Sequence, residues 1–404
     1  MTIDWIEGFE HQVKGSPSAY PDGSLQPSLW YFGEGTGQTT FPAGRTGVCM
    51  HMVQNGAANV RQIGPLRVGS AQRHFSFFLK MSANPSVEST VFRSTTSGGA
   101  ANHVTLTIST AGLIKCQMGG GTTITGPDVV DGNWHRIDVW GDTSKTTWVA
   151  KWRVDGAAQT DSTQSGQTAG SLCAQAIIGS STSTHTATFD IDDLVSGSAG
   201  DTEYPFNGGV DYNIGSLLPN ADGTHNNASS FLVNEAGGVI GAGGGAAYSR
   251  LNTWPYAGSV LVKMIGFDAD DYAEILFGDT SETNILGAAI IQIGGGYTAE
   301  NFNAQSYVYD SGNNNILTIY NGNMGGGSTA DRGLNTAIPP PGGDSWTQAE
   351  LNGLKVRFGY SGSNVNNSTH TPKWQEFMVQ YIYAAPTTPP VIRKLRTVSS
   401  PLRW

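Results

Sequence analysis

Four carboxylates lie close together in the stretch FDADDYAE, namely Asp268, Asp270, Asp271 and Glu274. Glycoside hydrolysis requires two carboxyl groups on either side of a groove, one of them with a raised pKa. The spacing of these residues would suit a strand that lines such a groove. Adjacent aspartates between two apolar runs are more typical of a solvated hairpin loop, and we favour that interpretation. An enzyme that uses Asp270 and Glu274 is the alternative.

A second acidic group, Asp190, Asp192 and Asp193, lies in the stretch FDIDDL. Clustered oxygens suit Ca²⁺, and Asp190 and Asp192 would share one face of a strand. The spacing differs from that of an EF-hand loop, and further ligands would have to come from other loops. A closing strand at an exposed sheet edge carries such charges to prevent pairing with another chain. We therefore expect these residues to protect an edge, and we predict no metal site.

The eight histidines are scattered along the sequence, and His135 beside Trp134 is the best candidate for catalysis among them. The sequence has no GxSxG nucleophile motif, and neighbouring strand residues point to opposite faces. We predict a half-exposed strand histidine. The glycine runs 119–121 and 294–296 lack the lysine and the following helix of a phosphate-binding loop, and we predict turns there. No catalytic residue and no cofactor is predicted.

Two aromatic residues, Trp254 and Tyr256, lie on a proline-containing segment, NTWPYAG. Exposed aromatic rings stack on sugar rings, so these residues are candidates for a glycan-binding or partner-binding surface. In the competing interpretation, which we favour, both fill the core of the surrounding domain.

The elements that would position these residues are β-strands. Apolar residues alternate with polar ones from residue 133 onward, at Trp134, Ile137, Val139, Trp148, Ala150, Trp152 and Val154. A period of two indicates strands with one buried face. Turn residues such as Asp155-Gly156 close each run. Further strands are expected at 48–53, 60–63, 74–80, 89–93, 104–109 and 113–118.

The stretch GSAGDTEYPFN, residues 197–207, has no periodicity and marks a domain boundary. Beyond it, strands are expected at 259–266, 273–278, 288–293, 307–309, 316–320, 355–360 and 376–383. The segment 237–245, rich in Gly and Ala, is expected to be irregular. One helical turn is predicted within 346–354, where Thr347 and Glu350 form a capping box. The predicted fold is all-β, with two antiparallel β-sandwiches in tandem, residues 1–198 and 199–385.

Composition agrees with many short strands joined by turns, because 13% of the residues are charged and 54 of 404 are glycine. The formal net charge of −10 argues against nucleic-acid binding, which needs concentrated Lys and Arg. The three cysteines, Cys49, Cys116 and Cys173, are far apart and without a CxxC pair, so isolated core or strand thiols are expected.

The first residues, MTIDWIEGFEHQ, contain no apolar signal region, and no apolar run is long enough to cross a bilayer. We therefore expect a protein that is made in a reducing compartment and is not inserted into a membrane.

The Trp134-His135 strand start, the Val-Asp-Gly end of the next strand and the closing FDIDDL stretch resemble the laminin-G-like, concanavalin-A-type jelly roll. This resemblance covers the first half of the chain and implies a jelly-roll sandwich there. Enzymes on this scaffold present a Glu-x-Asp-x-x-Glu strand. The sequence has no such strand, which favours a protein that is not an enzyme.

The start GFEHQ and the ordered stretches FDIDDLVSGSAGD, LLPNADG and WTQAELNGL to KVRFGYSG resemble two-part minor structural proteins of tailed bacteriophages. The resemblance implies a virion protein made in the host cytoplasm, a minor tail or tail-tip component that contacts other virion proteins. Symmetric homo-oligomers and contact with a host-surface glycan are also expected. The alternatives are a carbohydrate-binding adhesin, a head decoration or head-fibre protein and, least favoured, a polysaccharide-cleaving enzyme.

The last segment, residues 386–404, is rich in proline and locally basic, and it also carries apolar residues. Such a chain is extended and does not pack on itself. We predict an arm that clasps an acidic neighbouring subunit, and a frayed terminus is the alternative. The residues expected to bind the partner are Val391, Ile392, Arg393, Lys394, Leu395, Arg396, Leu402, Arg403 and Trp404.

Overall fold

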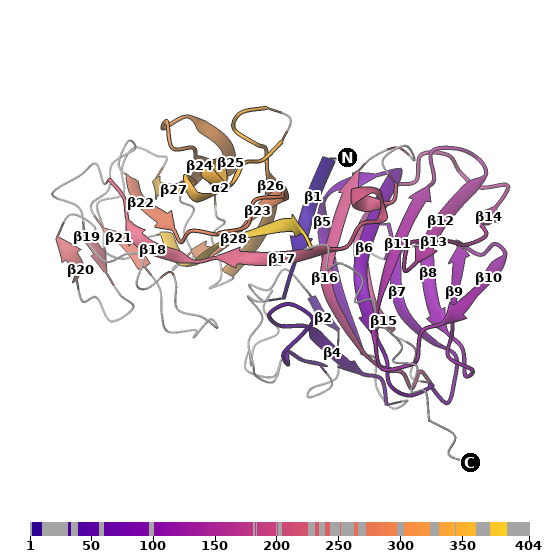
Figure 1. Cartoon of the computed structure of the whole chain (residues 1–404). Coiled ribbons are helices and arrows are strands. Elements are labelled where there is room, and N and C mark those ends of the chain that lie inside the picture. Colours follow the sequence, from indigo (N-terminus) through magenta and orange to yellow (C-terminus); the bar gives the residue numbers. More distant parts are fainter. Residues whose placement is uncertain are drawn as a thin grey trace, which may run out of the picture.

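The computed structural model describes residues 2–9, 31–33, 39–55, 60–96, 101–180, 182, 184–198, 200, 204–224, 231–233, 239–242, 251, 262–265, 272–296, 303–323, 331–343, 345–360 and 372–385. Within these residues the strands form four antiparallel sheets (Figure 1). The all-β, antiparallel fold class is therefore confirmed.

The strands up to Ser198 form two sheets that pack face to face. In the described residues, the nine-stranded sheet has the order β13-β12-β11-β6-β16-β4-β3, with β1 paired to β16 and β14 to β12. Its strands are β1 (Thr2–Glu7), β3 (Thr39–Thr40), β4 (Met50–Val53), β6 (Gln72–Lys80), β11 (Trp134–Asp142), β12 (Trp148–Val154), β13 (Ala157–Ala158), β14 (Ser162–Gln164) and β16 (Thr188–Ser198).

The facing seven-stranded sheet has the order β10-β9-β8-β7-β15-β5-β2. Its strands are β2 (Tyr31–Gly33), β5 (Val60–Ser70), β7 (Ser89–Thr95), β8 (Asn102–Ile108), β9 (Leu113–Met118), β10 (Thr123–Asp128) and β15 (Cys173–Ser180).

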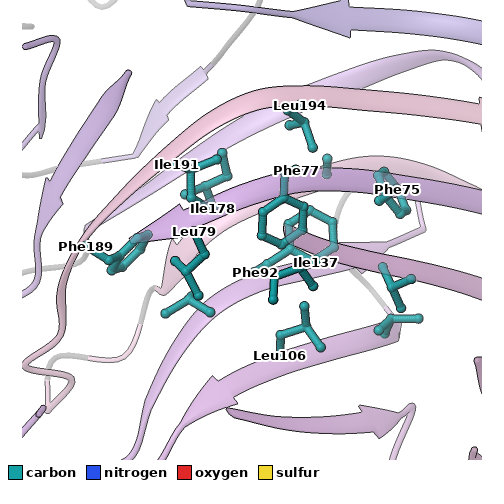
Figure 2. Packing of buried hydrophobic residues seen from close by; sticks show 14 of the residues in the cluster. Phe75, Phe77, Leu79, Phe92, Leu106, Ile137, Ile178, Phe189, Ile191 and Leu194 are labelled. Atoms are coloured by element: carbon teal, nitrogen blue, oxygen red, sulfur yellow. The ribbon is translucent and has the colours of Figure 1, made fainter. Parts of the chain in front are cut away.

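The core between these two sheets is apolar and rich in aromatic rings. Figure 2 shows Phe75, Phe77 and Phe92 in this core. The ring centroid of Phe92, on β7, lies 5.0 Å from that of Phe75 and 5.0 Å from that of Phe77, both on β6. On β12 the alternate residues Trp148 and Trp152 are buried, as the periodicity predicted. Burial of one such side chain stabilises the fold by about 1.5–3 kcal/mol.

The strands from Tyr212 onward form the other two sheets. The seven-stranded one contains β17 (Tyr212–Leu217), β19 (Phe231–Val233), β20 (Val239–Ala242), β21 (Val262–Ile265), β23 (Ile285–Gly296), β26 (Asp331–Ile338) and β28 (Pro372–Ala384). The five-stranded sheet has the order β18-β22-β27-β24-β25. Its strands are β18 (Pro219–Asp222), β22 (Tyr272–Phe277), β24 (Asn303–Tyr309), β25 (Asn315–Asn323) and β27 (Lys355–Tyr360).

The predicted helical turn is α2 (Gln348–Asn352), and its capping box is present. Thr347 Oγ1 accepts a hydrogen bond from the Glu350 backbone N–H, and Glu350 Oε2 accepts one from the Thr347 N–H. Leu351 and Leu354 are buried against the core of the second pair of sheets. A short 3-10 turn, η4 (Phe206–Gly209), lies in the predicted boundary segment.

Two predictions about glycine-rich segments were wrong. Residues 237–245 contain β20, because Val239 and Ile240 supply the branched side chains that favour a strand, and β20 pairs with β19. Residues 294–296 are not a turn. They are the end of β23 and pair with β28 and β26 on its two sides.

The two pairs of sheets meet at β1, which lies between them in Figure 1. β1 pairs with β16 on one side, and its Ile6 belongs to an apolar cluster with Val195, Ile214 and Ile382. The carbonyl of Ile6 also accepts a hydrogen bond from Asn335 Nδ2 at 2.5 Å. The contact between the two halves is therefore buried and apolar, with polar links across it.

Candidate functional site

The outward face of the five-stranded sheet carries a group of aromatic and polar side chains. Alternation along the strands explains why they gather there, since residues such as Ile275 on β22, Val308 on β24 and Val356 on β27 are fully buried on the inner side. Their neighbours point outward. We call this group the tyrosine face, and it consists of Tyr272, Gln305, Tyr307, Tyr309, Asn315 and Arg357.

Strand register brings these residues together. β27 lies between β22 and β24, so Arg357 is level with Glu274 on one side and with Tyr307 on the other. Gly359 is level with Tyr272 and Gln305 in the same way. Since glycine has no side chain, it leaves a gap above the middle strand. The tyrosine face, with Phe358 and Gly359, lines a hollow of about 330 Å³.

Arg357 is held at the centre of the tyrosine face. Its Nε donates to Glu274 Oε2 at 2.6 Å, and its Nη2 donates to Asn313 Oδ1 at 2.8 Å. The guanidinium carbon lies 4.6 Å from the ring centroid of Tyr272 and 4.2 Å from that of Tyr309. Such cation–π contacts and the ion pair fix the side chain in one position.

Glu274 is not part of a solvated loop, as the sequence had suggested. It lies within β22, is 3% exposed and also accepts a hydrogen bond from the backbone N–H of Thr224. A buried carboxylate needs such partners, and this one balances the charge of Arg357. Asp268, Asp270 and Asp271 lie outside the described residues, so the predicted acidic pair is not tested.

The prediction that Asp190, Asp192 and Asp193 protect an exposed edge was wrong. β16 lies inside its sheet, between β6 and β4, and a register shift after Asp192 places Asp193 at a φ of 49°. This bulge breaks the alternation, so Asp192 and Asp193 are both fully buried. Asp190 is partly exposed and pairs with His51 at 2.5 Å.

Asp192 and Asp193 bind the segment before β4. Arg45 Nη1 donates to Asp193 Oδ2 at 2.6 Å and to the Tyr212 carbonyl at 2.8 Å. The Ile214 N–H donates to Asp193 Oδ1 at 3.1 Å, and the Arg45 N–H donates to Asp192 Oδ2 at 2.6 Å. We call Arg45, Asp192 and Asp193 the junction cluster, because their partners Tyr212 and Ile214 belong to β17 in the other pair of sheets.

The junction cluster is a carboxylate pair with one cationic partner. Burial raises the pKa of Asp192 to about 8, and the neighbouring charge of Asp193 adds to this rise. Burial also raises the pKa of Asp193, to about 6, against the lowering effect of Arg45. Folding therefore favours protonation of this carboxylate pair. In the described part of the chain, no group of three or more His, Cys, Asp or Glu side chains is placed to hold a metal ion.

His135 lies on β11, as predicted, but its side chain is 13% exposed and so is more buried than the half-exposed histidine that was predicted. Its Nδ1 is 2.8 Å from Asp155 Oδ2, and its Nε2 is 3.0 Å from Asp131 Oδ1. Burial lowers the pKa of His135, but the hydrogen bonds to the two carboxylates outweigh it, and the pKa is raised. This arrangement fixes a turn between strands.

The three cysteines are free and buried, as predicted, at Cys49, Cys116 and Cys173. Burial raises the pKa of the Cys49 thiol to about 12, so it remains protonated and unreactive.

The other predicted site residues lie outside the described residues, so their placement stays a prediction. They are Trp254 and Tyr256, and the arm residues Val391, Ile392, Arg393, Lys394, Leu395, Arg396, Leu402, Arg403 and Trp404. None of the helices in the described part of the chain combines the length and the apolar character needed to cross a lipid bilayer.

Comparison with known proteins finds no matching family model and no matching curated protein. A Trypanosoma rangeli sialidase structure matches 43% of this chain and 31% of its own, with 11% identity and a TM-score of 0.32. A second sialidase matches 54% of this chain and 22% of its own, with 12% identity and a TM-score of 0.37. The cellulose-induced protein Cip1 matches 48% of this chain and 97% of its own, with 11% identity and a TM-score of 0.33. Similarity at this level does not identify a function.

Proposed function

We propose that this chain is a non-enzymatic structural component of a bacteriophage virion, a minor tail or tail-tip protein that mediates assembly. The observation that carries the proposal is the buried contact between the two pairs of sheets. Contacts between domains of one chain are ordinarily polar and permit motion. Here an apolar cluster and the junction cluster join the halves, which suits a building block that must keep its shape.

The sequence supports the same proposal. The ordered stretches that resemble minor structural proteins of tailed phages run through both halves of the chain. The body is acidic, and the segment 386–404 is basic and carries apolar residues. In the proposed assembly this segment binds an acidic surface on a neighbouring virion subunit, in a symmetric homo-oligomer.

Particle composition tests the proposal. Purified virions should contain the chain in a fixed copy number, and antibodies against it should label one place on the particle in electron micrographs. Removal of residues 386–404 should leave the protein folded but prevent its incorporation. If the protein is absent from purified particles, the proposal fails.

Labelling on the capsid instead of the tail would favour a head decoration or head-fibre protein. A glycan-binding adhesin is the second candidate function, and the tyrosine face favours it. The enzyme alternative predicts release of reducing ends from a polysaccharide, and this release would be abolished by Asp270→Asn or Glu274→Gln.

A further inference from the structure

We propose that the tyrosine face binds the ring of an uncharged pyranose sugar in a surface glycan. A place in the virion and a sugar site are separate properties, and each can be present without the other. Incorporation into particles tests the first property, and sugar binding tests the second.

The hollow has the size and shape of a small-ligand site. Its volume of about 330 Å³ is at the lower end of the range for such sites, which suits a sugar ring better than a large cofactor. Its floor is the sheet itself, because Gly359 lies level with Tyr272 and Gln305 and adds no side chain. The site is therefore built on strands, which hold its side chains more firmly than loops do.

Tyrosine rings form the apolar part of the hollow. Tyr307 and Tyr309 are two residues apart on β24, point outward and lie with their ring centroids 6.4 Å apart and their planes at 77°. Neither ring is fully buried. The axial C–H bonds of a pyranose make one face of the sugar apolar, and that face stacks on an aromatic ring. The hydroxyl group at the solvent-facing end of the tyrosine ring remains available for hydrogen bonding.

Amide and hydroxyl groups at the rim match the other side of a sugar. Gln305 and Asn315 line the hollow, and Tyr307 Oη donates to Gln305 Oε1 at 3.1 Å. Side-chain amides both donate and accept, as sugar hydroxyl groups do. A few placed polar groups among aromatic ones are the usual lining of a site that fixes the orientation of its ligand.

The charges of the site indicate an uncharged ligand. The cation of Arg357 is paired with Glu274 at 2.6 Å, and its guanidinium carbon lies over the rings of Tyr272 and Tyr309. A site for sialic acid or a sulfated sugar would direct its arginine at the ligand carboxylate or sulfate. The amine of Lys355 donates to Asn313 Oδ1 at 2.8 Å. Hydrogen bonds from Asn314 lower the pKa of the nearby Asp310, and the charge of Lys355 adds a smaller lowering. The charges around the hollow are thus balanced.

Binding of the full chain to a printed array of neutral and anionic oligosaccharides tests this site. We expect saturable binding to a set of neutral glycans, with little change between 50 mM and 500 mM NaCl, because uncharged ligands are not screened by salt. The Tyr307→Ala variant should bind at least about tenfold more weakly, as is common for a tyrosine at the centre of a contact. Tyr307→Phe keeps the ring and should retain most of the affinity.

A second variant keeps every aromatic ring and fills the hollow. Gly359→Val places a branched side chain, of a type common in strands, between Tyr272 and Gln305, and it should also weaken binding at least about tenfold. Leu172→Ala removes an exposed apolar side chain, 52% accessible, from the residue directly before β15 in the other half of the molecule and serves as the matched control. Its binding should equal that of the parent protein.

Three results would overturn the proposal. The first is that no neutral glycan on the array binds. The second is that neutral glycans bind, but Tyr307→Ala and Gly359→Val do not weaken this binding. The third is that only anionic glycans bind and that this binding disappears at 500 mM NaCl. Each variant is compared with the parent chain only if its thermal unfolding temperature agrees within a few degrees. If Tyr307→Ala and Gly359→Val both unfold, Gln305→Ala, which removes an amide that lines the hollow, replaces them and should weaken binding at least about tenfold.

Discussion

Two arginine–carboxylate pairs of equal length lie in opposite halves of the molecule and have different surroundings. Arg45 and Asp193 are 2.6 Å apart in the junction cluster, and Arg357 and Glu274 are 2.6 Å apart beside the tyrosine face. Both arginines also lie over aromatic rings, Arg45 over Phe78 at 3.6 Å. The chemistry of the two pairs is the same.

The two arginine–carboxylate pairs differ in what lies over them. β17 lies against the junction cluster and supplies Tyr212 and Ile214 as hydrogen-bond partners. The hollow beside Arg357 is open, since the described residues place the five-stranded sheet at the surface there. The comparison teaches that one set of groups, an arginine, a carboxylate and an aromatic ring, joins two parts of this protein where β17 covers it. Where no strand of the described residues covers it, the same set borders the proposed ligand site.

Removal of the covered carboxylate should have the largest effect. Asp193→Ala leaves Arg45 buried without its anion and leaves the Ile214 N–H without its acceptor. We expect a loss of about 3–5 kcal/mol in the free energy of unfolding, the usual result of breaking a buried pair. Urea unfolding measures this loss. A change below 1 kcal/mol would show that the junction cluster does not hold the two halves together.

Removal of the carboxylate beside the open hollow should reduce stability less and should alter sugar binding. Glu274→Gln keeps the shape of the side chain but leaves the Arg357 cation unbalanced, so we expect a loss of about 1–3 kcal/mol by the same urea measurement. The tyrosine face would then carry a positive charge, and the glycan array should shift toward anionic sugars. Unchanged array specificity would contradict the role given to this ion pair.

Acid should stabilise the junction cluster. The pKa of Asp192 is raised in the folded state to about 8 from an ordinary value of 3.8, so the protonated form is favoured by folding. Its contribution is complete below pH 4 and is lost as the pH rises to about 8. We expect the unfolding temperature to be a few degrees lower at pH 8.5 than at pH 5.5, because the stabilisation by the protonated form is lost over this range.

The Asp192→Asn variant tests the origin of this pH dependence. Because asparagine does not titrate, the difference between pH 5.5 and pH 8.5 should shrink. If the variant keeps the full difference, other groups cause it. Glu274→Gln is the matched control, since it lies in the other cluster and should leave the slope unchanged.

The smallest effect is expected at α2, which belongs to neither cluster. Thr347→Ala removes one half of the capping box, and we expect a loss of about 1 kcal/mol in urea unfolding. Thr347→Ser, which keeps the hydroxyl group, should lose much less. Glycan binding should not change in either variant, so any loss of binding would show that α2 positions the tyrosine face.

Sequence periodicity located the strands better than it located either cluster. The bounds of β9 and β27 were predicted correctly, because apolar and polar residues alternate along them. β26 was missed, since DRGLNTAI shows little alternation, and β20 was missed because glycines surround its two branched residues. Pairing with neighbouring strands forms these elements, and that pairing is not visible in a short window.

The two sites depend on contacts between distant residues. Asp193 binds Arg45, 148 residues earlier, and Arg357 binds Glu274, 83 residues earlier. The alternation of Gln305, Tyr307 and Tyr309 was a signal for an outward aromatic row that could have been used. Only the strand order β22-β27-β24 shows that Arg357 lies beside that row.

The position of β1 has a consequence for how the chain is completed. The N–H of Gly8, directly after this strand, donates to Gln380 Oε1, 372 residues later, so β1 gains this contact only when β28 is present. A product that stops before Pro372 would still pair β1 with β16, but Ile6 and Val195 would lack Ile382. Such a fragment would expose an apolar surface that promotes aggregation. We therefore expect a fragment that ends before Pro372 to aggregate more readily than the whole chain.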